Sequence, residues 1–331
     1  GASDIHIEPY EENLSIRFRI DGILKEKLNP SSRIAPLLNA RIKVMSNLDI
    51  AERRIPQDGR MSLKLGEKWV DIRVSTLPSS FGERLVLRLL DKADASLDLE
   101  ELGMTSEMTK DYLQQLKSTS GIILVTGPTG SGKTTTLYSG LNFLNDQTRN
   151  ILTVEDPIEY ALEGVGQTQV NNKVGLSFSK GLRAILRQDP DVVMVGEIRD
   201  KETAETAIQA SLTGHLVLST IHTNDSVGAI TRLIDMGVEP YLLASTLKMV
   251  IAQRLVRKLI NKNEFSGRVG IFEMIKIDSE IKNYINETVD EDKIRKIAFK
   301  KYNSLLNDGE EKVKKGITSE LEIKRVLKQV D

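Results

Sequence analysis

A glycine-rich stretch, GPTGSGKT at residues 127–134, constrains the fold of this chain more than any other feature. The apolar run IILVT comes directly before it, and a helix-favouring run, TTTLYSGLNFL, continues from its end. In this context the backbone N–H groups of the turn can surround phosphates, while lysine adds a positive charge and threonine binds Mg²⁺. The sequence therefore predicts an ATP site in which Lys133 contacts phosphates and Thr134 binds the metal. Its predicted cofactor-binding residues are Gly127, Pro128, Thr129, Gly130, Ser131, Gly132, Lys133, Thr134 and Thr135.

The region around this loop repeats a pattern of apolar run, turn and helix. The apolar runs are IILVTG, ILTVED, DVVMVGE and HLVLSTIH. Unalternated runs rich in β-branched residues, separated by helices, predict a parallel sheet that is covered on both faces. Because such sheets bind ligands at the carboxyl ends of their strands, we expect an α/β fold with its site at that edge.

Acidic residues follow two of these apolar runs. Glu197 ends DVVMVGE, and ILTVEDPIEY contains Glu155, Asp156 and Glu159. A carboxylate at the end of a buried strand faces the phosphates, so we expect Glu197 to orient the metal and the attacking water. The alternative is that each of these carboxylates is a turn residue or a helix cap.

Two of the three histidines, His215 and His222, flank one apolar run. A single histidine is more often structural than catalytic. His222, however, lies at the carboxyl end of its strand next to Thr220 and Thr223. At that position it could sense a γ-phosphate, and we weigh this role evenly against the structural one.

The first ninety or so residues have the alternating pattern of a small α+β domain. In SIRFRIDG, apolar residues alternate with Arg17 and Arg19, and Asp21-Gly22 predicts a hairpin turn. Residues 34–45 have helical spacing, and two more alternating runs place Arg73 and Arg88 on an exposed sheet face. These arginines either keep that face soluble or bind a ligand.

Composition excludes several classes of protein. Lysine and arginine (46) nearly balance aspartate and glutamate (47), so no global basic field indicates nucleic acid. The chain has no cysteine, which excludes disulfides and thiolate metal sites, and it has no apolar run as long as a membrane span. We expect a cytoplasmic protein, and a fragment, because the chain starts at Gly1 in a strand-like segment.

The polar segment 92–104 lacks strand alternation and is predicted to be a linker and hinge. The expected domains are an N-terminal α+β domain at residues 1–95, a linker at 96–105, a nucleotide-binding domain at 106–260 and a helical C-terminal region at 261–331.

Taken together, these motifs resemble the secretion-superfamily ATPases that power type II secretion systems and type IV pili. The resemblance covers nearly the whole chain, and the type II secretion branch is the nearer of the two. Its motifs are GPTGSGKT, the aspartate box ILTVEDPIEY, the metal-strand box RQDPDVVMVGEIRD, the histidine box TGHLVLSTIHTN, and the flanking stretches GASDIHIEP, RFRIDG, KVMSNLDIAERRIPQDGR, VSTLPSSFGERLVLRLLD and GITSELE.

The resemblance implies a RecA-like ATPase domain behind a small PAS-like domain, and a hexamer that holds ATP between neighbouring subunits. It implies ATP and Mg²⁺ as cofactors, with Thr134 and Glu197 at the metal. Lys133 and Glu197 match the phosphate-loop lysine and the metal-strand glutamate, Glu159 matches the proposed general base, and His222 matches a histidine that contacts the γ-phosphate.

Arginines of the family also have counterparts here. Arg73 and Arg88 match arginines that reach the γ-phosphate, where guanidinium groups stabilise charge on the transferring phosphoryl group. Other functional or interface arginines of the family are matched by Arg19, Arg183, Arg187, Arg199 and Arg232.

One departure concerns zinc. Members of the secretion type usually carry a tetracysteine zinc insert after the segment that matches AQRLVRKL, but INKNEFSGRVGIFEM follows it here without cysteine. The chain either lacks the metal or has lost the insert, so no zinc is assigned.

The resemblance implies a motor that drives pseudopilus assembly for protein export, at the cytoplasmic side of the inner membrane. Its implied partners are an inner-membrane platform protein and a membrane-anchored recruiting protein. A pilus assembly or retraction ATPase is the nearest alternative. A hexameric nucleic-acid translocase would need a basic channel with stacking aromatics. Its best candidate, VIAQRLVRKLINKN, is more typical of one helix face, so no nucleic acid is expected. A small-molecule kinase lacks a recognisable acceptor pocket.

Overall fold

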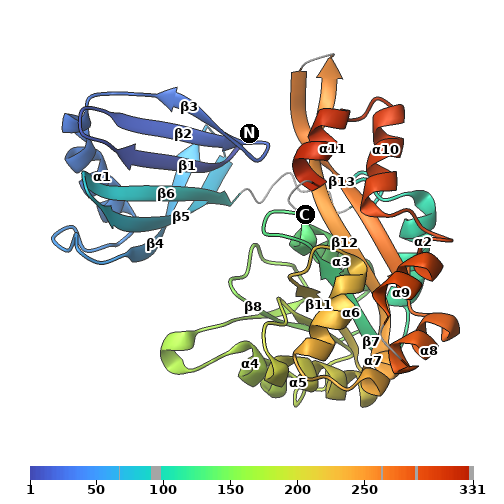
Figure 1. Ribbon diagram of the computed structural model, residues 1–331. Coiled ribbons are helices and arrows are strands. Elements are labelled where there is room, and N and C mark those ends of the chain that lie inside the picture. The colour runs from blue at the N-terminus through green and yellow to red at the C-terminus, as the bar shows by residue number, and fades with distance from the viewer. Residues whose placement is uncertain (67, 91–97, 262–263, 288–289, 328–331) are drawn as a thin grey trace. The chain divides into compact units, whose positions relative to one another are not determined.

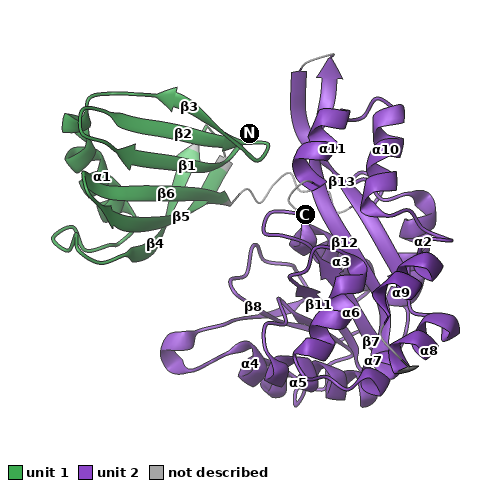
Figure 2. Cartoon of the chain, viewed as in Figure 1, with its two compact units in different colours: residues 1–95 green, residues 96–331 purple. Residues whose placement is uncertain are grey.

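The computed structural model describes the chain except for residues 67, 91–97, 262–263, 288–289 and 328–331. The chain divides into two compact units, Gly1–Ala95 and Ser96–Asp331 (Figure 2). Among the described residues, no helix is both long enough and apolar enough to cross a membrane.

The first unit is a six-stranded antiparallel sheet in the order β3-β2-β1-β6-β5-β4. Its apolar residues alternate onto one face, where Ile72 and Val74 of β5 pack in one cluster with Ala35 and Ile42 of the helix α1. The expected hairpin turn is confirmed, with Asp21 at φ 50°. The elements are β1 (Ala2–Pro9), β2 (Leu14–Ile20), β3 (Ile23–Leu28), a 3-10 turn (Ser32–Ile34), α1 (Ala35–Met45), β4 (Gln57–Leu65), β5 (Lys68–Ser79) and β6 (Gly82–Leu90).

The opposite face of this sheet carries a row of arginines. Strand register places Arg73 of β5 between Arg60 of β4 and Arg88 of β6. On the other side of Arg88 lies Asp4 of β1, which in turn faces Arg19 of β2. Like charges directly opposite each other destabilise a sheet. The row therefore gathers positive charge on this face of the sheet, with Asp4 as a counter-ion for Arg88 and Arg19.

The second unit contains a seven-stranded sheet in the order β13-β12-β7-β11-β10-β8-β9. Every neighbouring pair is parallel except β12 with β13, so the predicted parallel sheet is present with one antiparallel strand at its edge. The strands are β7 (Gly121–Thr126), β8 (Ile151–Glu155), β9 (Gly166–Gln169), β10 (Val192–Val195), β11 (Leu216–Ile221), β12 (Leu247–Asn261) and β13 (Glu264–Lys276).

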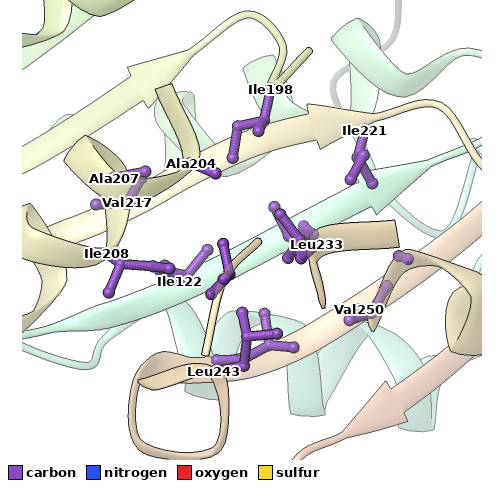
Figure 3. Close-up of a cluster of buried hydrophobic side chains, with 14 of the residues drawn as sticks. Ile122, Ile198, Ala204, Ala207, Ile208, Val217, Ile221, Leu233, Leu243 and Val250 are labelled. Carbon is purple, nitrogen blue, oxygen red and sulfur yellow. The ribbon is translucent and has the colours of Figure 1, made fainter. Parts of the chain in front are cut away.

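Helices cover both faces of this sheet, as the sequence predicted (Figure 1). One face packs against α2 and α3, which contribute the fully buried Tyr112 and Tyr138. The other face packs against α4 to α9, and Figure 3 shows Ala204, Ala207 and Ile208 of α5 packed with residues of the sheet. The helices are α2 (Ser106–Leu116), α3 (Lys133–Leu144), α4 (Phe178–Ile185), α5 (Lys201–Leu212), α6 (Ser226–Asp235), α7 (Pro240–Thr246), α8 (Ser279–Glu287), α9 (Glu291–Ala298), α10 (Leu305–Lys314) and α11 (Glu320–Leu327).

The expected linker needs correction in its second half. Residues 91–97 lie outside the described residues. From Asp98 onward the chain already belongs to the second unit, because Leu99 and Met104 are buried in its core and Leu102 accepts a hydrogen bond from Gly270. The segment is polar on the whole and has no strand alternation, but its few apolar residues pack into the core of the second unit.

The expected helical region at 261–331 is wrong at its start. Residues 264–276 form β13, which pairs with β12 along most of its length. Its apolar residues Val269 and Ile271 join Val256 of β12 in a small core under α10 and α11. The prediction of one helix face for VIAQRLVRKLINKN is also wrong, since residues 247–261 are the strand β12.

Candidate active site

The phosphate loop joins β7 to α3 in a conformation that needs glycine. Gly127, Gly130 and Gly132 have backbone φ angles of 146°, 79° and 89°, which residues with a side chain rarely adopt. Space is also restricted, because a Cβ on Gly127 would lie 2.4 Å from the carbonyl oxygen of Gln253. The loop ends at Lys133, the first residue of α3, so the free N–H groups of that helix face the loop.

Lys133 is held inside the loop. Its Nζ donates to the carbonyl oxygens of Gly127, at 2.7 Å, and Pro128, at 3.0 Å. Burial lowers the pKa of Lys133 to about 8, Glu197 opposes this shift and Arg254 adds to it. Ser131 contributes a buried hydroxyl for which the described residues supply no hydrogen-bond partner. The loop therefore offers a cation and a free hydroxyl to a phosphate.

Glu197 follows β10 and lies beside His222, which follows β11. Its Oε2 is 3.3 Å from His222 Nε2, and its Oε1 is 2.5 Å from Arg199 Nη2. The backbone fixes this arrangement, because Ile198 N donates to Thr220 O at 2.9 Å and Thr220 Oγ1 donates to Gly196 O at 2.6 Å. The structure thus brings together three of the residues that the sequence predicted for the site.

The charge state of His222 follows from its surroundings. Burial, and then the charge of Lys133, lower the pKa of His222 below its usual value of 6.5, although Glu197 opposes the shift. The imidazole is therefore neutral at pH 7. A neutral ring keeps both a donor and an acceptor nitrogen.

The residues present fit a magnesium ion. Glu197 is 7% exposed. Its buried Oε2 lies 3.3 Å from His222 Nε2 and, among the described residues, accepts no hydrogen bond of regular geometry. Such an oxygen is suited to a cation or to the water bound to one. Among the described residues no group of three or more acidic or histidine side chains could hold a metal alone. This pattern suits Mg²⁺, which usually takes one or two protein ligands and completes its shell with waters and phosphate oxygens.

Glu155 has different surroundings from Glu197. It is buried at the end of β8, where it accepts hydrogen bonds from Tyr138 Oη, from Thr153 Oγ1 at 2.6 Å and from Gln167 Nε2 at 3.0 Å. This network ties α3 and β9 to β8. Asp156 is exposed, and Glu159 is half-buried in the segment after β8.

Two predicted arginines of this unit, Arg183 and Arg232, lie on helices, and Arg187 follows the end of α4. Arg183 of α4 pairs with Glu202 and donates to Ser179 Oγ at 2.9 Å. Arg187, one turn later, donates to the carbonyl oxygen of Arg183, and Arg232 is exposed on α6. Their described contacts are with residues other than those of the phosphate loop.

The arginines of the first unit share the row described above. Arg88 is 57% exposed and its Nε donates to Asp4 Oδ1 at 3.0 Å. Arg19 Nε lies 3.8 Å from the other oxygen of Asp4, while Arg73 is half-buried. Burial would raise the pKa of Asp4, but hydrogen bonds from Ser3 and Arg88 lower it. Asp4 is therefore charged and holds Arg88 and Arg19 in place.

Sequence reasoning missed the residues of β12 behind the phosphate loop. Thr136 Oγ1 of α3 donates to Gln253 Oε1 at 2.7 Å, and Arg254 lies buried beside Gly127. The available signal was the pair Gln253-Arg254 within the apolar run VIAQRLV, because buried polar residues need partners. Arg60 was missed as well, although it alternates with the buried Met61.

The family model described as "Type II/IV secretion system protein" matches residues 1–327. The chain belongs to this family. Among curated members of the family, it is 53% identical over 365 residues to the type II secretion system protein E of Pseudomonas aeruginosa. It is equally similar, over the same length, to the type II secretion system ATPase E of Vibrio cholerae. Each match covers 99% of this chain and 73% of the relative.

Solved structures give a consistent comparison. The chain is similar to the ATPase DotB of Legionella pneumophila, with a TM-score of 0.78, 25% identity and coverage of 98% of this chain and 91% of that one. The pilus retraction motor PilT with bound ADP gives a TM-score of 0.70, 29% identity and coverage of 98% and 93%. The sheet and helices of the second unit fit a RecA-like ATPase domain, and these relatives of the type II/IV secretion family support an ATPase.

Both curated alignments are longer than this chain, which has 331 residues. These members of the type II/IV secretion family therefore carry residues that this chain lacks.

Proposed function

We propose that this chain is the ATP-hydrolysing motor subunit of a type II secretion system and drives pseudopilus assembly for protein export. One observation carries the chemistry. In the unit that carries the phosphate loop, Glu197 follows the strand β10, and its buried Oε2 lies 3.3 Å from His222 Nε2 but accepts no hydrogen bond of regular geometry from the described residues. Membership of the type II/IV secretion family, with relatives 53% identical that are named type II secretion proteins, supports the biological role.

The residues of the second unit have separate roles in hydrolysis. Loop N–H groups and Lys133 bind the β- and γ-phosphates, and Thr134 and Glu197 hold Mg²⁺. Bound there, Mg²⁺ would neutralise phosphate charge. Glu197 also orients the attacking water, Glu159 acts as its general base, and His222 contacts the γ-phosphate as a neutral donor.

The arginine row of the first unit completes the site. We assign Arg73 and Arg88 to the γ-phosphate, delivered by a neighbouring subunit of a hexamer, with Arg19 in support. Guanidinium groups placed there stabilise the charge that spreads over the transferring phosphoryl group. In this proposal the first unit is a PAS-like domain, and each turnover changes its angle to the ATPase domain. Arg183, Arg187, Arg199 and Arg232 serve the nucleotide or the subunit interfaces.

The proposed location is the cytoplasmic face of the inner membrane. The motor would act there on an inner-membrane platform protein and be recruited by a membrane-anchored partner. Nucleic acid is not an expected partner. In the basic segment VIAQRLVRKLINKN, Arg254 and Arg257 do not form an exposed patch. Arg254 is 4% exposed, and Arg257 pairs with Glu322.

A pilus motor is the second candidate, because the pilus retraction motor PilT matches 98% of this chain. One experiment decides between the two. Lys133→Ala is introduced into the native gene, and both protein export to the medium and surface pili are measured. We expect export to stop and pili to persist. Loss of pili with normal export would assign the motor to pili, and unchanged export and pili would reject both.

A further inference from the structure

Arg254 of β12 is buried between two loops of the candidate active site. It is 4% exposed, its Nη2 donates to Asn224 O at 2.6 Å, and its Nη1 donates to Gln253 O at 3.1 Å. Nη1 also lies 3.1 Å from the position that a Cβ on Gly127 would occupy. The guanidinium therefore contacts the first glycine of the phosphate loop on one side and the loop after β11 on the other.

The charge of this guanidinium has no direct counter-ion in the described part of the chain. Among the residues that the structure describes, no carboxylate lies within 4.0 Å of it. Burial lowers the pKa of Arg254, and the more distant Asp225 and Glu273 only oppose that shift. A buried cation held only by carbonyl oxygens is costly, and a nucleotide phosphate at the loop would offset that cost.

The loop after β11 carries His222 and has several other attachments. Thr223 N donates to Thr126 Oγ1 at 2.9 Å, and Ser226 N donates to Glu273 Oε1 at 2.9 Å. Asp225 pairs with Arg295 of α9 at 2.6 Å. Because these contacts hold the loop in the fold, removal of Arg254 alone should leave the protein folded. It would release Asn224 from the guanidinium beside Gly127, while Thr223 stays attached to Thr126.

We propose that Arg254 is a positioning residue for ATP hydrolysis. It fixes the loop that carries His222 against the phosphate loop, so that His222 and Lys133 contact the same phosphate. This inference rests on the proposed function. It assigns Arg254 no contact with substrate, because the side chain is buried behind Gly127.

The test compares Arg254→Met, Arg254→Lys and the control Arg257→Met, on the same strand. Arg257 pairs with Glu322 of α11 at 2.8 Å and has no place in the proposed site. The kcat and KM for ATP and the Kd for ADP are measured on each variant, with far-UV circular dichroism at 25 °C to verify folding.

We expect Arg254→Met to lower kcat at least about tenfold with less than about a threefold change in Kd for ADP, the pattern of an interaction made mainly in the transition state. Arg254→Lys keeps the charge but cannot reach both carbonyl oxygens, so it should recover only part of the lost kcat. Arg257→Met should keep kcat within about twofold of wild type, because the pair of Arg257 with Glu322 lies outside the proposed site and does not affect the chemical step.

Three results would overturn the inference. A folded Arg254→Met protein with wild-type kcat would show that Arg254 is not needed to hold the loop after β11 against the phosphate loop. An equal fold decrease in affinity for ADP and in kcat/KM, with kcat unchanged, would show that the charge of Arg254 serves nucleotide binding and that Arg254 is not a positioning residue. Unfolding of both Arg254 variants at 25 °C would show a structural arginine. An inactive wild-type protein would instead reject the proposed function itself.

Discussion

Two carboxylates at the ends of neighbouring strands differ in how their oxygens are satisfied. Glu155 accepts hydrogen bonds from Tyr138, Thr153 and Gln167. Glu197, by contrast, has one buried oxygen that lies 3.3 Å from His222 Nε2 but accepts no hydrogen bond of regular geometry from the described residues. Buried polar atoms in folded proteins nearly always have partners, so an oxygen with only this contact is suited to a further ligand. At this scale Glu197 has the environment of a functional residue and Glu155 that of a residue that ties elements together.

Arg88 and Arg84 offer a matched test of the arginine row. Both lie on β6, both are partly exposed, and each pairs with a carboxylate of β1, Asp4 or Glu8. If Arg88 reaches a γ-phosphate, Arg88→Ala should lower ATP turnover by about a thousandfold, as for a lost arginine finger. Arg84→Ala should stay within about twofold of wild type, since Arg84 has no place in the proposed site and Glu8 keeps its pair with Arg17. Equal turnover in the two variants, measured by phosphate release, would remove Arg88 from the site.

At the scale of elements, Glu322 of α11 anchors the C-terminal helices to β12. It is 1% exposed and accepts hydrogen bonds from Arg257 Nη2 at 2.8 Å and Arg325 Nε at 2.9 Å. Burial would raise the pKa of Glu322, but these arginines lower it to about 2, below its usual 4.5. A lowered carboxyl pKa stabilises the folded protein above the unfolded pKa, and this contribution is lost as the pH falls towards the folded pKa.

We therefore expect Glu322→Gln to lower the free energy of unfolding by about 3 kcal/mol at pH 7, because it removes the buried carboxylate whose pKa the two arginines lower. The difference from wild type should shrink steadily between pH 5 and about 3. Urea unfolding at each pH measures it. The control Glu320→Gln removes an exposed pair with Lys324 on the same helix and should change little. A difference that is constant with pH would show that the carboxylate charge is not what holds α11.

The elements that the sequence predicted are those with strong local patterns. The unalternated runs before Gly127 and Glu197 became parallel strands, and the alternating runs around Arg73 and Arg88 became antiparallel ones. The strand β12 was missed because its outer half is basic and polar, and only pairing with β13 and packing under α11 make it a strand. Such tertiary pairing leaves no local signal.

The same limit applies to the candidate site. The phosphate loop and Glu197 follow from motifs in contiguous sequence. Arg254 comes from a strand more than a hundred residues further on and meets Gly127 only through the order of the sheet, in which β12 lies next to β7. Its role could not be predicted from spacing.

At the scale of the whole molecule, the account requires sites completed between subunits. An Arg73→Ala chain keeps its phosphate loop, and a Lys133→Ala chain keeps its arginine. If sites are completed in trans, a mixture of the two will pair an intact loop with an intact arginine and exceed the ATPase activity of either parent. Inactive mixtures that form mixed oligomers, verified by differently tagged chains, would remove the trans claim and leave the arginines catalytic.

The central claim is that this chain binds ATP at the phosphate loop and hydrolyses it with Glu197. The most direct measurement pairs ATP affinity with phosphate release for wild type, Lys133→Ala, Glu197→Gln and the control Glu107→Gln, an exposed carboxylate of α2. We predict that Lys133→Ala loses binding, because it removes the charge that holds the phosphates, while Glu197→Gln binds ATP with near wild-type affinity and releases at least about a hundredfold less phosphate. Normal phosphate release by Glu197→Gln, or equal loss of ATP binding in both variants, would contradict the account.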